Sequence, residues 1–238
     1  MKLNRREILA GIGGFGSLLF LGNSLKAAAL QNPQNNNNAL EVTAVEDLMR
    51  EHGVLRRALM IYSIAAERLK EVPYKISTGS IRKTAMLFRT VGEDYHEKQL
   101  EETYIFARLK KYGGLSEDYI NIFLTQHQRG RQITDYILNE TRLTAFNTGR
   151  VPVLILALES MVRMYRAHTA QEDTVIFPAW KQTLEADEYD KLGDQFEEIE
   201  QQSLGRNGYE NAVQQIRNIE AEVGISDLAY FTAPVPGI

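Results

Sequence analysis

Apolar side chains recur at intervals of three and four residues through most of the chain after residue 43, which is the repeat of a helix with one buried face. Thr43 and Glu46 form a capping box, so the first helix is expected to begin there. Glu71-Val72-Pro73 is expected to end it, because proline cannot continue a helix. The apolar stripe between these points comprises Leu48, His52, Leu55, Leu59, Tyr62, Ala66 and Leu69.

Three further helices with the same repeat follow the first. The second is expected to be capped by Ser80 and to end at Gly113-Gly114, and the third is expected to open at Ser116. Pro152 suits the first turn of the fourth helix, because the N–H that proline lacks is unused at that position. Together the four helices account for residues 43–185.

No alternating strand pattern of useful length is present, so the sequence predicts an all-α protein. Four long helices with short connections favour an antiparallel four-helix bundle over residues 43–185. Beyond Pro178, residues 187–203 and 209–223 form two more amphipathic stretches. These two helices belong to a C-terminal extension, residues 186–238, that is expected to pack outside the bundle and to contribute no chemistry.

The N-terminal residues 1–29 have the pattern of an export signal. Arg5-Arg6 precedes an apolar stretch from Ile8 to Leu21, and three small residues, Ala27 to Ala29, follow it. Paired arginines before the apolar stretch resemble a twin-arginine signal, which implies export of a folded protein to the periplasm or beyond. Residues 30–42 are rich in asparagine and are expected to form a flexible linker.

A membrane anchor is the alternative interpretation of the same apolar stretch. A membrane-spanning helix normally needs about 18 or more apolar residues. The stretch from Ile8 to Leu21 is shorter and contains four glycines, so cleavage of the signal is favoured. We therefore expect no stable membrane span once the signal is removed.

Composition limits the chemistry that the remaining chain can carry. The sequence contains no cysteine, which excludes disulfides, iron–sulfur clusters and thiolate zinc sites, so a bound metal must use nitrogen and oxygen ligands. The formal net charge is -4, and the N-terminal segment is basic, so the rest of the chain is more acidic than this value suggests. An acidic protein without a basic face is not expected to bind nucleic acid.

The four histidines of the chain fall one on each expected helix of the bundle. They are His52, His96, His127 and His168. A single histidine on an apolar face is usually a hydrogen-bonded core residue. Four such residues are harder to explain in that way, because burying each without a partner costs about 1–3 kcal/mol. The pattern therefore indicates a shared site.

The two halves of the bundle repeat a His–Glu arrangement. His168 and Glu172 are four residues apart and so differ by about 40° around a helix. Glu101 follows His96 in a matching run, so each half supplies two histidines and one glutamate. Glutamates between two histidine pairs can bridge metal ions about 3.5–4 Å apart. Imidazole and carboxylate ligands favour two iron ions, with manganese or zinc as alternatives.

The spacing on the second helix differs from that on the fourth. Glu101 lies five residues after His96, a step of about 140° that would turn the two side chains apart in a regular helix. A π-bulge absorbs one extra residue and would bring both side chains inward. Glu102 is the alternative ligand, and a solvated surface charge is the alternative role for either glutamate.

These residues resemble the hemerythrin-like, or HHE cation-binding, family. The resemblance rests on Glu51-His52 with Arg56-Arg57, His96 with Glu101-Glu102 before Phe106, His127 with Arg131, and His168 with Glu172 before Phe177-Pro178. It covers residues 43–185 and implies a four-helix bundle with a di-iron centre between the helices. The metal ligands that it implies are His52, His96, Glu101, His127, His168 and Glu172.

The chain departs from this family on the third helix. Oxygen-carrying hemerythrins have a second histidine four residues after the first, and Arg131 stands at that position here. One imidazole ligand fewer argues against reversible oxygen carriage and leaves a coordination position open. Arg131 is expected either to stabilise a bound peroxide or other anion, or to form an ion pair with a carboxylate.

Three functions compete on this evidence. The leading hypothesis is a protein that binds dioxygen, nitric oxide or iron in the cell envelope. The second is a di-iron enzyme that turns over hydrogen peroxide or oxygen, and the third is a metal-free helical bundle. No separate acid–base pair is evident in the sequence, so binding is favoured over catalysis.

Overall fold

In a computed structural model, residues 42–112, 115 and 117–237 are described. The expected signal, residues 1–29, lies outside them, and so does nearly all of the expected linker. Among the described residues, no helix combines the length and the apolar character needed to cross a membrane.

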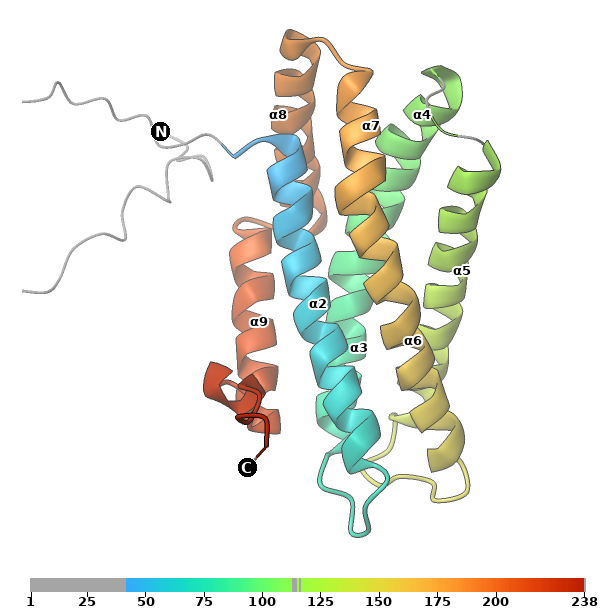
Figure 1. Cartoon of the computed structure of the whole chain (residues 1–238), viewed down its shortest axis with the longest axis vertical. Helices are drawn as coiled ribbons and strands as arrows, with labels where there is room; N and C mark the ends of the chain where they lie inside the picture. The colour runs from blue at the N-terminus through green and yellow to red at the C-terminus, as the bar shows by residue number, and fades with distance from the viewer. Residues whose placement is uncertain (1–41, 113–114, 116, 238) are drawn as a thin grey trace, which may run out of the picture. The chain divides into compact units, whose positions relative to one another are not determined.

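The described residues form helices and no strands, which confirms the all-α class (Figure 1). Several helices continue directly into one another and form long segments that lie side by side. The elements are α2 (Ala44–Arg68), α3 (Thr78–Leu87), η1 (Phe88–Phe106), α4 (Ala107–Tyr112), α5 (Glu117–Glu140), α6 (Val151–Gln171), η2 (Glu172–Ile176), α7 (Phe177–Gln182), α8 (Ala186–Ser203), α9 (Gly208–Val223) and η3 (Leu228–Phe231). The segments η1 and η2 are π-helical, and η3 is a 3₁₀ turn.

Most expected helix boundaries are close to the observed ones. Helix α2 begins directly after Thr43, and Pro152 lies in the first turn of α6. The expected cap at Ser80 is wrong, because the Oγ of Ser77 accepts the backbone N–H of Ser80 at 3.0 Å and α3 begins at Thr78. Ser77 has the extended backbone that a capping residue needs, whereas Ser80 already lies in the first turn.

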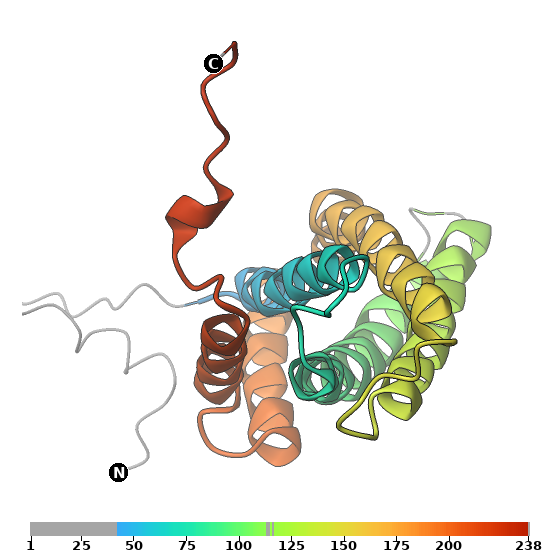
Figure 2. The same cartoon turned by 90° about the horizontal axis from the view of Figure 1, so that it is seen from below.

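Helices α8 and α9 pack against α2 and the segment formed by α3 and η1, as the end-on view shows (Figure 2). The guanidinium group of Arg57 donates to both carboxylate oxygens of Glu220 in α9, at 2.7 and 2.5 Å. The hydroxyl of Tyr189 in α8 accepts the backbone N–H of Val45 at 3.0 Å. An N–H in the first turn of α2 has no partner within its own helix, so the extension satisfies it.

The buried apolar side chains form two clusters with a polar layer between them. On α2, Leu48 belongs to one cluster and Val54 to the other, and His52 lies between them in sequence. On the segment formed by α6 and η2, Tyr165 and Ile176 belong to different clusters. The apolar core is therefore interrupted at the level of the histidines.

Two helix-interior glycines provide a matched test of this packing. A Cβ on Gly130 of α5 would stand against the hydroxyl of Tyr165 and within 2.9 Å of two of its ring carbons. A Cβ on Gly53 of α2 would meet no atom within 4 Å. We expect Gly130→Ala to cost about 1–3 kcal/mol through overpacking. Gly53→Ala should stabilise the protein by about 0.5–1 kcal/mol, because alanine restricts the unfolded chain.

Urea denaturation of the two variants measures these changes in the free energy of unfolding. If Gly130→Ala were as stable as Gly53→Ala, the close approach of α5 to Tyr165 would be wrong.

Candidate metal centre

The helix that carries His96 and Glu101 is widened, as the five-residue spacing predicts. Residues Phe88–Phe106 are π-helical. The hydroxyl of Thr103 donates to the carbonyl of Lys98, five residues back, at 2.9 Å. In α6, which is a regular α-helix, the hydroxyl of Thr169 donates to a carbonyl four residues back. The widening turns both His96 and Glu101 into the interior, and the Nε2 of His96 lies 3.1 Å from Oε1 of Glu101.

A second π-helical turn begins at Glu172, and the sequence did not lead us to expect it. This turn, Glu172–Ile176, ends just before Pro178, and the helix continues through the proline as α7 to Gln182. Proline in a helix interior has no N–H to donate and crowds the carbonyl four residues back. A local change of helical repeat before Pro178 accommodates it, so the proline was the available signal.

All six residues expected at the site lie together in the interior. Each is at most 3% exposed. The histidines form two pairs whose Nε2 atoms face each other: His52 with His96 at 3.0 Å, and His127 with His168 at 3.1 Å. The two glutamates are Glu101 and Glu172.

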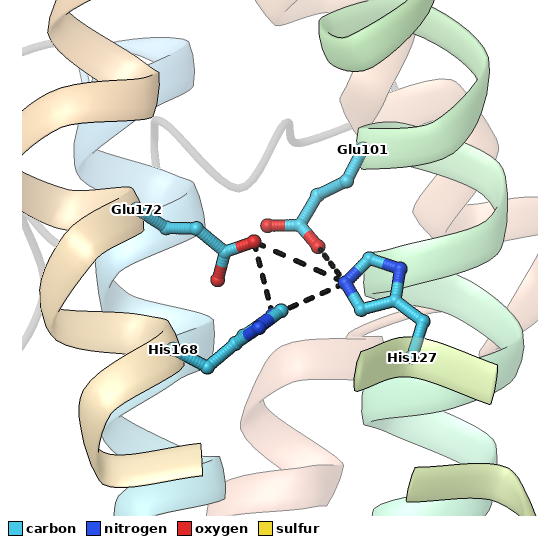
Figure 3. Close-up of side chains that lie close together, drawn as sticks. All are labelled: Glu101, His127, His168 and Glu172. Atoms are coloured by element: carbon cyan, nitrogen blue, oxygen red, sulfur yellow. Dashed lines mark hydrogen bonds and ion pairs between the residues drawn. The ribbon is translucent and has the colours of Figure 1, made fainter. Parts of the chain in front are cut away.

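The carboxylate of Glu101 lies between the two histidine pairs. Its Oε1 is 3.1 Å from Nε2 of His96. Its Oε2 is 3.3 Å from Nε2 of His127 (Figure 3). Each oxygen therefore faces a different pair. This is the arrangement that a bridging carboxylate requires.

Glu172 repeats the arrangement from the opposite side. Its Oε1 is 3.0 Å from Nε2 of His168, and its Oε2 is 3.5 Å from Nε2 of His52. Within the described residues, neither oxygen of Glu172 accepts a hydrogen bond, and the same is true of Oε2 of Glu101. Buried carboxylate oxygens without hydrogen bonds are costly unless a cation compensates them.

The other ring nitrogen of each histidine is held by an acceptor on the far side. The four Nδ1 contacts are His52 with Asp173 at 2.7 Å, His96 with Glu51 at 2.7 Å, His127 with Glu102 at 2.9 Å and His168 with Gln126 at 2.8 Å. Because an ionised carboxylate and the amide oxygen of Gln126 can only accept, the Nδ1 atoms carry protons. In a neutral imidazole the Nε2 atom then presents a bare lone pair to the centre.

A cation is needed where these groups meet. Two lone pairs about 3 Å apart repel each other, and the unbonded carboxylate oxygens add negative charge. Protons can supply the positive charge. Burial lowers the pKa of His96, but the carboxylates of Glu101 and Glu51 outweigh this effect and raise the pKa well above its usual value. Burial also lowers the pKa of His127, but Glu97 and Glu101 raise it to about 10.

Metal ions could supply the same positive charge between the Nε2 atoms and the carboxylate oxygens. The first group of potential ligands is Glu101, His127, His168 and Glu172, and the second is His52, His96 and Glu101. Within each group the ligand atoms lie within 4.8 Å of one another, and Glu101 belongs to both. Imidazole nitrogens and carboxylate oxygens are ligands for iron, manganese and zinc. The residues present therefore fit a centre of two metal ions.

The alternative ligand Glu102 lies outside this cluster. It is partly exposed and accepts hydrogen bonds from Nδ1 of His127 and, at 2.5 Å, from Nη2 of Arg131. The same Nη2 donates to Glu97 at 3.2 Å. Of the two roles considered for Arg131, these contacts favour the ion pair with carboxylates.

Sequence reasoning did not assign the residues that hold the Nδ1 atoms. Glu51 and Gln126 each directly precede a histidine, and Asp173 directly follows Glu172. Asp173 also forms an ion pair with Arg56. The repeated position of these residues beside a ligand in each half was the signal that could have identified them.

Comparison with known proteins agrees with this geometry. A family model described as the hemerythrin HHE cation binding domain matches residues 43–180. The uncharacterized proteins Rv1995 of Mycobacterium tuberculosis and Mb2018 of Mycobacterium bovis are each 40% identical to the chain over 192 residues, which is 80% of this chain and 74% of theirs. No solved structure matches the chain.

The raised pKa values predict how the stability of the metal-free protein depends on pH. A histidine whose pKa is higher in the folded than in the unfolded state stabilises the fold below the unfolded pKa of about 6.5, and this stability is lost as pH rises through the folded value. Melting temperatures of metal-free and metal-loaded protein should therefore diverge between about pH 6.5 and about pH 10. A metal ion replaces the protons, so the loaded protein keeps its stability at the centre.

Ionisable groups far from the centre titrate equally in the metal-free and the metal-loaded protein. Their effects therefore cancel in the difference between the two melting temperatures. A metal-free His127→Gln variant is the control, because it should lose less stability over the same range. A constant difference between the two melting curves at every pH would contradict the proposed charge balance.

Proposed function

The chain belongs to the hemerythrin HHE cation-binding family, and we propose that it is an exported di-iron protein that binds dioxygen, nitric oxide or iron in the cell envelope. One observation carries this proposal. Two buried histidine pairs face each other across two glutamates, and each glutamate has one oxygen toward each pair. The proposed ligands are His52, His96, Glu101, His127, His168 and Glu172.

The fold that we propose is the antiparallel four-helix bundle of this family, with α8 and α9 outside it. Long helical segments lie side by side (Figure 1). The four histidines come from α2, η1, α5 and α6, and all four are buried. The pairing supports two related halves, because His52 and His96 come from α2 and η1 whereas His127 and His168 come from α5 and α6.

The protein's own residues prepare this layer for metal. Glu51, Asp173, Glu102 and Gln126 hold the Nδ1 protons and so fix each imidazole with its Nε2 toward the centre. The apolar clusters above and below exclude water, which strengthens electrostatic interactions within the layer. Bound iron would supply redox chemistry and open positions for a small ligand.

Export rests on the N-terminal pattern. The pair Arg5-Arg6, the apolar stretch after it and Ala27 to Ala29 support a cleaved twin-arginine signal and a periplasmic or otherwise exported mature protein. Export in the folded state suits a protein whose metal is inserted before it leaves the cytoplasm. After cleavage we expect no membrane span.

A specific feature of the centre favours the second candidate, an enzyme acting on hydrogen peroxide or oxygen. Each proposed metal position has two imidazoles and shared carboxylates. Two histidines and one carboxylate with open positions are typical of non-haem iron sites that activate oxygen. Arg131, one of whose expected roles was to stabilise peroxide, is instead paired with Glu97 and Glu102.

Iron analysis tests the proposed function directly. Protein incubated anaerobically with ferrous iron and desalted should retain about two iron atoms per chain and absorb in the near ultraviolet by ligand-to-metal charge transfer. Glu101→Gln should lose at least one of them, because the amide presents only one acceptor oxygen. The change Asp94→Asn, at an exposed position of the same helical segment, is the matched control and should retain both.

Less than about half an equivalent of iron in the unchanged protein would overturn the proposal. Equal loss of iron from the two variants would instead overturn the assignment of Glu101.

Turnover of hydrogen peroxide separates binding from catalysis. A binding protein should consume peroxide no faster when loaded with iron than its His168→Ala variant does, once both rates are divided by iron content. An excess of two or more orders of magnitude in the unchanged protein, typical of the loss of an essential group, would identify the enzyme.

A further inference from the structure

Two of the four histidines have outer partners of the same kind, a carboxylate that is paired with an arginine. The Nδ1 of His52 donates to Asp173, and Arg56, four residues after His52, forms an ion pair with Asp173. The corresponding residues on the other side are His127, Glu102 and Arg131. The two metal positions are therefore alike in this part of their surroundings.

The other two histidines break this symmetry. The Nδ1 of His96 lies 2.7 Å from the carboxylate of Glu51, which directly precedes His52. The Nδ1 of His168 lies 2.8 Å from the side-chain oxygen of Gln126, which directly precedes His127. Corresponding positions thus hold a charged acceptor in one half and a neutral amide in the other.

We propose that Gln126 makes the metal position of His127 and His168 weaker than that of His52 and His96. This inference rests on the proposed function. A carboxylate that accepts the Nδ1 proton increases the electron density on the imidazole, so its Nε2 binds a cation more strongly than an imidazole held by an amide. Changes of such outer partners typically alter metal affinity about 10–100-fold.

Glu97 is a further carboxylate on the side of His127, but it does not hold the Nδ1 of either His127 or His168. Its carboxylate is 3.9 Å from Nδ1 of His127, which is beyond hydrogen-bond length. Its two oxygens accept hydrogen bonds from the hydroxyl of Tyr165 at 2.6 Å and from Arg131 at 3.2 Å. Glu97 therefore contributes negative charge near His127 but accepts no hydrogen bond from an imidazole of the centre.

The surroundings of Glu51 reinforce the difference. Tyr95 donates its hydroxyl to Oε1 of Glu51 at 2.9 Å, which leaves Oε2 for His96. Oxygens of Asp47 and of Glu200, from α8, lie within 4.8 Å of one another and of a Glu51 oxygen. Carboxylates thus gather behind His96: Asp47 is paired with Arg50 at 3.5 Å, and Glu200 comes from the C-terminal extension.

Two consequences follow for metal loading. The first ferrous ion to bind occupies the position of His52 and His96. The ion beside His127 and His168 is the first that a chelator removes.

The iron affinity of each metal position can be measured in a variant that keeps only that position, because repulsion between two bound ions is then absent. His168→Ala retains the position with Glu51, and His96→Ala retains the position with Gln126. Anaerobic calorimetric titration with ferrous iron should give about 10-fold tighter binding for His168→Ala than for His96→Ala. Adding Gln126→Glu to His96→Ala should remove this difference.

Gln128→Glu in the same His96→Ala background is the matched control, because Gln128 lies on α5 two residues away and is exposed. It adds the same charge outside the centre and should leave the affinity unchanged. Equal affinities of the two single-position variants, or no effect of Gln126→Glu, would overturn the inference.

Gln126→Glu alone keeps all six ligands and provides a test that does not depend on the folding of the alanine variants. The two steps of its titration should move closer together than those of the unchanged protein, and steps that move apart would contradict the inference. Failure of the unchanged protein to bind iron would instead overturn the proposed function.

Discussion

Six ionisable side chains are buried in one layer, and the rest of the structure depends on how their charges are balanced. The layer interrupts the apolar core, so it contributes few of the contacts that normally stabilise a helical protein. Its four imidazoles present lone pairs inward, and its two carboxylates have oxygens without hydrogen bonds. Only positive charge at the centre, from protons or from metal, makes this arrangement favourable.

The backbone is shaped by the same requirement. A regular helix would have pointed Glu101 away from His96, and the π-helical segment η1 turns both inward. The acceptor groups on the outer side of each imidazole fix its orientation, so that metal binding requires little rearrangement. Helix α8 then extends the polar network, since Glu200 reaches the surroundings of Glu51.

Most of the helices and all six residues of the layer could be predicted from sequence, because periodicity and histidine spacing act within single helices. The five-residue step from His96 to Glu101 even indicated the widening of η1. The contacts of Glu51 and Gln126 could not be predicted in this way, because each partner lies on a different helix and its identity depends on packing. The cap at Ser77 was missed because Ser80 is an equally good capping residue by type.

The most direct test of the account is the anomalous X-ray scattering of crystals of the iron-loaded protein, measured at the iron absorption edge. The account predicts two peaks in the polar layer, one beside the Nε2 atoms of His52 and His96 and one beside those of His127 and His168. A layer without an iron peak, or with iron bound only elsewhere on the protein, would contradict it.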